Sequence, residues 1–319
     1  MSLSAKPFKP YSDLVSILES RGMDIEDRAR AERKLAQVGY YRFTGFSFPC
    51  RVYAKDATGN LICNPPKSRF IERTDQFVEG TTFDKVFKLY LFDKNLRLLM
   101  LDAIERIEVY MRSIIAHEMG FHSPTAYIDQ TFINPRAIAK WNQWQQKHND
   151  AISNSTQECI SWHKATNRTM PFWVVIEAWD FGLMSHYFSY LNGKYQNKIC
   201  ARIDKSILPY MLENWLREIN TLRNRCAHHT RIWNQSTNNN LEMPQTGPLS
   251  TVNWGPKGKS RLFGLILIMW FLVEHIGKNS SWLLSIAELI EGMPILPTCN
   301  KEVMGFPSQS LPAIDQLCI

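Results

Sequence analysis

Three residues of this 319-residue chain have the side chains that acid–base chemistry on a phosphate needs, and they lie close together: Arg223, Asn224 and His228. An imidazole can move protons near neutral pH. A guanidinium can bind a phosphate and stabilise the charge that develops on it, and the asparagine amide can orient either group. Together they could promote attack by an RNA 2′-hydroxyl on the adjacent phosphate, without a metal or a cofactor.

The helix that carries these residues decides where they point. Its core face is marked by apolar residues at helical spacing, which are Ile219, Leu222 and Cys226. At about 100° per residue, Asn224 and His228 stack on one face, roughly 150–190° from the core direction, with Arg223 at the boundary. A histidine of the core would point with the leucines. The alternative is a histidine at a helix end, where it interacts favourably with the helix dipole beside surface arginines.

The same spacing of an arginine and a histidine occurs at Arg112 and His117. Here His117 is expected to turn toward the apolar stripe of its helix, with Arg112 on the opposite face. Glu105 and Glu108 share the face of Arg112, and Glu108 to Arg112 is the spacing of a helical ion pair. The pattern favours a salt-bridged polar face. A second interpretation is that Glu105, Glu108 and Arg112 line the pocket next to the site at 223–228.

Helical periodicity predicts the elements that must position these residues. A long helix, or two abutting ones, is expected from a capping box at Thr81 and Asp84 to a stop at Gly120. Further helices are expected at 12–38 (in two pieces), 136–150, 171–188, 209–226, 261–276 and 281–290. A long loop is expected at 235–260. Strands do not alternate convincingly anywhere, so the predicted fold class is all-α with long loops.

The composition suits a globular protein with an anionic partner. The formal net charge is +7, the sequence pI is about 9.0, and 45% of the residues are hydrophobic. A basic excess favours polyanions, because each Lys or Arg that meets a phosphate releases condensed counterions. No Walker A, GxGxxG, HExxH or GxSxG motif occurs. Nucleotide hydrolysis, zinc-protease and serine-hydrolase activities therefore lack support.

The cysteines and the apolar segments indicate the compartment. The seven cysteines are widely spaced without a CxxC motif, which argues against a disulfide framework or a zinc site. The N-terminus lacks the apolar segment of a signal peptide. The longest apolar run, Leu262–Val273, is shorter than the roughly 20 residues of a membrane span. We expect a cytoplasmic protein with free thiols and with no metal, cofactor or membrane partner.

Several blocks of the sequence resemble one known family. Residues 223–229, followed by Trp233-Asn234, resemble the RNxxxH signature of HEPN ribonucleases, and in particular the Abi-like family of bacterial abortive-infection proteins, the AbiD/AbiF group. Further blocks resemble that family in the same order: Gly39–Arg42 with Gly45, 89–97, 104–112, and Pro171–Trp173 with Phe181-Gly182. The resemblance extends from about Tyr11 to Gln235.

The resemblance implies both an architecture and a function. The architecture is a HEPN-like helical bundle, with an N-terminal helical segment at 1–72, a core at 73–236, and a loop and C-terminal helices at 237–319 that complete the bundle. The implied function is a metal-independent endoribonuclease in anti-phage defence, with Arg223, Asn224 and His228 as its catalytic residues. HEPN sites are usually composite, which implies a homodimer. Relatives are linked with small noncoding RNAs, so an inhibitory RNA is a further expected partner.

Other residues are expected near the pocket or the RNA: His229, Arg225, Arg231, Arg112 and Glu105. Because His229 directly follows His228, either imidazole could act, although the family pattern favours His228. Trp141 and Trp144, near Lys140, Lys147 and His148, are interpreted as an RNA-facing surface or as one face of a packed helix.

Two functions of different classes therefore remain. One is a toxin-type endoribonuclease that acts as a dimer, and the other is a non-catalytic regulator that binds a structured RNA. Both predict affinity for RNA, whereas only the enzyme needs Arg223 and His228 in a water-accessible composite pocket. A purely protein-binding module would show no salt-dependent RNA affinity.

Overall fold

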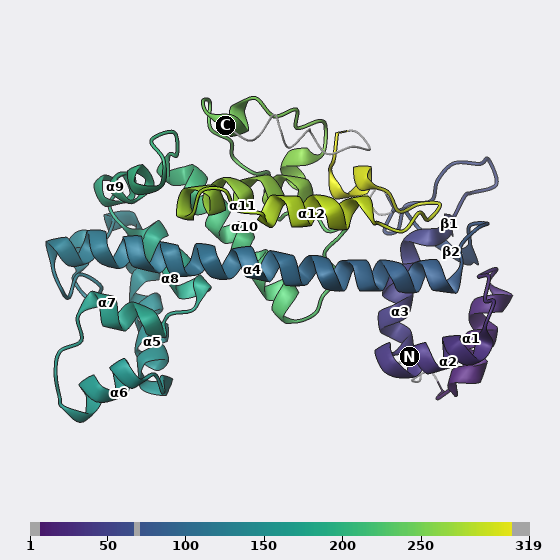
Figure 1. Ribbon diagram of the computed structural model, residues 1–319, viewed down its shortest axis with the longest axis horizontal. Helices are drawn as coiled ribbons and strands as arrows, with labels where there is room; N and C mark the ends of the chain where they lie inside the picture. Colours follow the sequence, from purple (N-terminus) through teal and green to yellow (C-terminus); the bar gives the residue numbers. More distant parts are fainter. Residues whose placement is uncertain (1–6, 67–70, 308–319) are drawn as a thin grey trace. The chain divides into compact units, whose positions relative to one another are not determined.

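Helices dominate the structure, a computed structural model that describes residues 7–66 and 71–307 (Figure 1). Twelve α-helices occur in these ranges. Their one sheet is an antiparallel pair of short strands, β1 (Arg51–Tyr53) and β2 (Arg73–Phe77). The prediction of an all-α fold with loops is confirmed. The hairpin was not predicted from the sequence. Its strands are short and show no clear alternation of burial.

The helices follow one another along the chain as α1 (Tyr11–Ser20), α2 (Arg28–Val38), α3 (Tyr40–Ser47), α4 (Phe83–His122), α5 (Ile138–Asn154), α6 (Glu158–Ala165), α7 (Phe172–Val175), α8 (Phe181–Tyr190), α9 (Gly193–Ile203), α10 (Pro209–Ala227), α11 (Leu262–Ile276) and α12 (Trp282–Glu291). None of the helices in the described ranges is both long enough and apolar enough to cross a membrane.

The chain divides into two compact units. Of the described residues, the first unit takes those up to Leu96 together with Glu288–Val303, and the second takes Arg97–Ala287 together with those from Met304. All the residues of the candidate site belong to the second unit. The three-part division at 72 and 236 stays a prediction.

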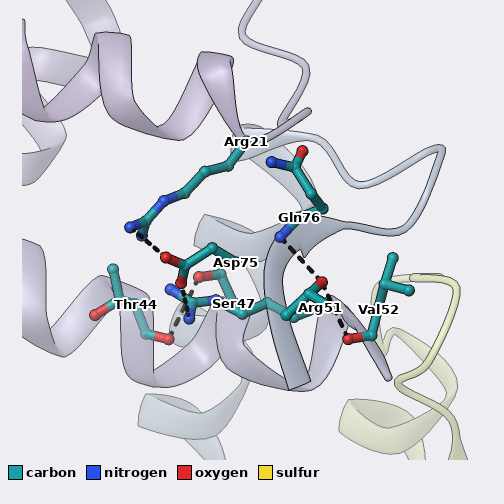
Figure 2. Close-up of polar contacts among 8 residues, drawn as sticks. Arg21, Thr44, Ser47, Arg51, Val52, Asp75 and Gln76 are labelled. Carbon is teal, nitrogen blue, oxygen red and sulfur yellow. Dashed lines mark hydrogen bonds and ion pairs between the residues drawn. The ribbon is translucent and has the colours of Figure 1, made fainter. Parts of the chain in front are cut away.

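An acidic residue of the hairpin holds two arginines in the first unit. Asp75 of β2 accepts hydrogen bonds from Arg21, at 2.9 Å, and from Arg51, at 2.8 Å (Figure 2). The Arg51 guanidinium also lies 5.7 and 5.8 Å from the ring centroids of Phe48 and Phe77. Because the Asp75 side chain is 60% exposed, each ion pair contributes at most about 1 kcal/mol. Asp75 and the two rings therefore orient Arg51 together.

The C-terminal segment of the first unit packs on the 3-10 turn that follows α3, Phe48–Cys50. Cys50 and Cys299 are both buried, with their sulfur atoms 3.7 Å apart. The hydrogen bond between these thiols lowers the pKa of Cys50 against the opposing effect of burial. No disulfide joins two cysteines within residues 7–66 and 71–307, and Cys318 lies outside those residues.

Helix α4 begins and ends differently from the prediction. Its capping hydroxyl belongs to Thr82, which accepts from the Lys85 N–H at 3.2 Å, whereas the Thr81 hydroxyl donates to Val78 O at 2.7 Å. The stop expected at Gly120 is wrong, since the helix continues to His122. Gly120 serves packing instead, because a Cβ at this position would lie 3.3 Å from the Trp173 ring.

Aromatic rings form a buried cluster in the second unit and break the helix expected at 171–188. After α7 and a 3-10 turn, Trp179 is extended, and its ring is buried against Trp144, Phe172 and Tyr187. Asp180 then caps α8 by accepting from the Leu183 N–H at 2.7 Å. The break is therefore the point at which Trp179 enters the core.

The rings of α5 belong to this core and not to an RNA-facing surface. Trp141, Trp144 and His148 are each less than 5% exposed. The His148 ring stacks on Trp144 with 5.2 Å between centroids, and its Nδ1 accepts from the Trp179 indole N–H at 2.9 Å. Burial lowers the pKa of His148 from 6.5 to about 4. His148 is therefore a neutral acceptor at physiological pH.

The depressed pKa of His148 predicts a loss of stability in acid. The unfolded chain binds a proton on this ring below pH 6.5, whereas the folded chain does not until about pH 4. The contribution of His148 to the free energy of unfolding is therefore fully present above pH 6.5, and the free energy falls by roughly 3 kcal/mol as the pH drops to 4. Urea unfolding of wild type and His148→Phe across this range is the measurement. We expect a flatter dependence in the variant, and equal slopes would show that His148 titrates normally.

Candidate functional site

Helix α10 presents the three candidate catalytic residues as helical geometry predicts. Its buried face packs against α8, α9 and α11 and includes Trp215, Ile219, Leu222 and Cys226 (Figure 1). Asn224 and His228 are exposed, and Arg223 is half-buried. The Arg223 Nη1 lies 3.4 Å from the Asn224 Oδ1, so the guanidinium and the amide are adjacent, with the imidazole one turn further along.

The two neighbouring histidines have different positions at the end of α10. His228 is the C-cap, and its N–H donates to Asn224 O at 3.0 Å, so it stays in register with the helix. His229 has a φ of +55°. Around it the Thr230 N–H bonds Arg225 O and the His229 N–H bonds Cys226 O, which is a Schellman ending. The helix face that carries Asn224 therefore continues to His228 and ends before His229.

The chain that follows α10 is fastened back along the same helix. Glu218 is buried, and its carboxylate accepts three hydrogen bonds of 2.9–3.1 Å, from the N–H groups of Asn238 and Asn239 and from the Asn239 amide. Further along the loop, Asn214 bonds the backbone of residues 240 and 242. Near the site, Arg225 donates to Ser236 O at 2.9 Å. These contacts hold the end of α10 in place.

Arg223 lies in the electric field of acidic residues on other elements. Burial raises the pKa of Glu108, on α4, while the positive charges of Arg112 and Arg223 oppose that rise and Asp180 adds to it. Arg112 donates to Glu108 and to Trp179 O, and lies 3.9 Å from Glu177. Arg112 and Glu108 thus form an ion pair near the corner where α8 begins, and the charge of Arg223 acts on the same carboxylate.

The remaining predicted residues are placed less closely around the site. Arg225 is bound to the following loop, and Arg231 is half-buried beyond the end of the helix. Glu105 is exposed on α4. His117 is also exposed, so the expectation that it turns toward the core is wrong. The buried stripe of α4 centres on Met111, about 120° around the helix from His117.

A polar cleft lies beside the site, between α5, α8 and α10. Its volume is about 840 Å³, and its lining includes Lys140, Lys147, Asp180, His186, Arg217 and Asn220. The sequence analysis did not predict that His186, Arg217 and Asn220 lie at this surface. Helical spacing could have indicated two of them, because residues 217 and 220 lie seven and four positions before Asn224, on the same side of the helix.

Within the ranges that the structure describes, no three His, Cys, Asp or Glu side chains are grouped so that they could hold a metal ion. The chemistry available at 223–228 is that of the side chains themselves: a cation, an amide and an imidazole on one exposed surface.

The contacts of Arg112 predict that it stabilises the fold. Arg112→Ala would leave the half-buried Glu108 carboxylate without its partner and Trp179 O without a donor. We expect a loss of about 1–3 kcal/mol in the free energy of unfolding. Glu105→Ala, at an exposed position of the same helix, should change it by less than about 0.5 kcal/mol. An unchanged melting temperature for Arg112→Ala together with reduced activity would instead assign Arg112 to the pocket.

The backbone of His229 predicts the effect of glycine there. A left-handed residue with a Cβ carries a cost of about 1 kcal/mol that glycine avoids. His229→Gly removes this cost and His229→Ala keeps it, so the glycine variant should have the higher melting temperature of the two. Both variants lack the imidazole, so their difference reports the backbone alone. Differential scanning calorimetry measures it, and equal melting temperatures would show that the left-handed backbone carries no cost at this position.

One family model matches the chain, and its description is Abi-like protein. The match covers residues 33–234, which include α4, the aromatic cluster and the whole of α10. Searches of curated proteins and of solved structures give no match. Because the family model spans more than half of the sequence, the chain belongs to the Abi-like family.

Proposed function

We propose that the protein is a metal-independent endoribonuclease of the HEPN type, whose catalytic residues are Arg223, Asn224 and His228. The observation that carries this proposal is the placement of the exposed Asn224 and His228 on one face of α10 with Arg223 beside them. A phosphodiester can approach this face from solvent.

The residues supply what cleavage by an internal nucleophile requires. The 2′-oxygen of the ribose attacks the adjacent phosphorus, and the bond from phosphorus to the 5′-oxygen breaks. One base must take the 2′-hydroxyl proton, and one acid must protonate the leaving 5′-oxygen. His228 performs a proton transfer, Arg223 stabilises the charge on the phosphoryl oxygens, and Asn224 orients the arginine. The products are a 2′,3′-cyclic phosphate and a 5′-hydroxyl.

Two proton transfers favour a site made by two copies of the chain. Each copy supplies one imidazole, His228, on the face that carries Asn224 and Arg223, because the left-handed turn at His229 ends the helix. In a homodimer with the two α10 ends facing each other, one His228 acts as base and the other as acid. The exposure of Asn224 and His228 in the single chain leaves room for this pairing.

Membership of the Abi-like family supports a role in abortive infection, in which an infected bacterium stops growing before the phage multiplies. RNA cleavage would produce that arrest, and a small noncoding RNA that binds the protein would restrain it in uninfected cells.

The decisive assay is RNA cleavage in EDTA by wild type, Arg223→Ala, Asn224→Ala and His228→Ala. Loss of the acid–base group should slow cleavage by about 10²–10⁴-fold, and loss of the charge-stabilising arginine by about 10²–10³-fold. Circular dichroism checks that each variant is folded. The product ends should carry a cyclic phosphate.

His117→Ala is the matched control. His117 is an exposed histidine of α4 and follows Arg112 at the spacing that separates His228 from Arg223. Its removal should leave the rate unchanged. If wild type, stripped of bound RNA, binds RNA but does not cleave it, the protein is a non-catalytic RNA-binding regulator. Equal rates in wild type and His228→Ala would also refute the proposed mechanism.

A further inference from the structure

The cleft between α5, α8 and α10 is lined by side chains from three helices. Cations come from α5 and α10, namely Lys140, Lys147 and Arg217. Helix α8 contributes His186 and Tyr190, together with the small residues Gly182, Ser185 and Ser189. A volume of about 840 Å³ lies within the range of sites that bind ligands of several rings. The cleft is therefore large enough for more than a single ion.

The carboxylates of the cleft have partners within the protein, whereas two of its lysines make no ion pair with any described residue. Its two carboxylates are engaged, since Asp180 caps α8 and Glu213 accepts from Arg217 at 2.6 Å. Lys140 and Lys147 are exposed to solvent and make no ion pair within residues 7–66 and 71–307. A bound anion would therefore find two available ammonium groups.

The cleft also offers a flat surface to an aromatic ligand. The His186 and Tyr190 rings stack with 6.0 Å between centroids and an interplanar angle of 15°. Burial and the charges of Lys147 and Arg217 lower the pKa of His186, so its ring is mainly neutral at pH 7. A neutral imidazole in an exposed side chain suits a nucleobase, which stacks on such rings without regard to its identity.

One side of α10 joins the cleft to the candidate catalytic residues. Arg217, Asn220 and Thr221 line the cleft, and Asn224 and His228 continue the same side at intervals of three or four residues. At 1.5 Å per residue, Thr221 and His228 are only about 10 Å apart along the axis. A chain of phosphates laid along α10 would pass from one to the other.

We propose that this cleft is the substrate groove and that it holds a single-stranded segment of RNA on one side of the phosphodiester that is cleaved. Lys140 and Lys147 bind backbone phosphates, and a base stacks on His186. The proposal rests on the proposed ribonuclease function for its substrate, but its test measures binding alone.

The experiment measures the affinity of a fluorescein-labelled single-stranded RNA of mixed sequence as a function of salt, in the His228→Ala protein so that no RNA is cleaved. Adding Lys140→Ala with Lys147→Ala should weaken binding and make the slope of log K against log salt shallower by about 1.4, because each phosphate contact on a single strand contributes about 0.7. Adding His186→Ala instead should weaken binding and leave the slope unchanged, because stacking releases no counterions.

The charge-matched control adds Lys205→Ala with Lys278→Ala, two exposed lysines outside the cleft. It should bind as the parent does. If both lysine pairs weaken binding equally, RNA is attracted by the overall positive charge and the groove proposal is wrong. It is also wrong if the cleft variant binds as the parent does, or if the parent does not bind RNA. If the cleft variant loses affinity but wild type never cleaves RNA, the groove stands and the ribonuclease proposal fails. If the cleft variant cleaves RNA with an unchanged KM, the ribonuclease proposal stands and the groove proposal fails.

Discussion

Burial of one face of α10 fixes the rotation of that helix about its axis, and the candidate site depends on this rotation. Trp215, Ile219 and Leu222 are removed from water, and each such side chain stabilises the buried orientation by about 1.5–3 kcal/mol. Turning the helix by one residue, or 100°, would expose Leu222 and bury polar side chains in its place. Asn224 and His228 are thereby confined to the outer face.

The length of α10 is fixed as firmly as its rotation. A buried carboxylate is strongly destabilising without partners, and the three partners of Glu218 all come from the loop after the helix. That loop can return along α10 only if the helix ends where it does, at the left-handed His229. The position of His228 at the last turn is therefore set by a carboxylate ten residues earlier and by a backbone turn, and not by its own side chain.

Local periodicity was enough to predict α10, the fold class and the outward direction of Asn224 and His228, because these depend on residues a few positions apart. Contacts across the sequence were not predictable in this way. Arg112 bonds the carbonyl of Trp179, 67 residues away, and the break before α8 exists because Trp179 enters an aromatic cluster. The cleft is likewise assembled from three helices, and only its α10 wall follows the spacing that the motif shows.

The two arginine–histidine pairs show why spacing alone does not make a site. Arg112 and Arg223 are both half-buried, and His117 and His228 are both exposed. On α4, however, Arg112 is turned inward to Glu108 and to a backbone carbonyl, so its charge is used within the fold. On α10, Arg223 touches the side chain of Asn224, on the face that leads to His228. The pair on α10 keeps its cation, amide and imidazole on one side of the helix, next to a cleft with two lysines that have no ion-pair partner in the described part of the chain. For this reason the proposed ribonuclease mechanism uses this pair and not the one on α4.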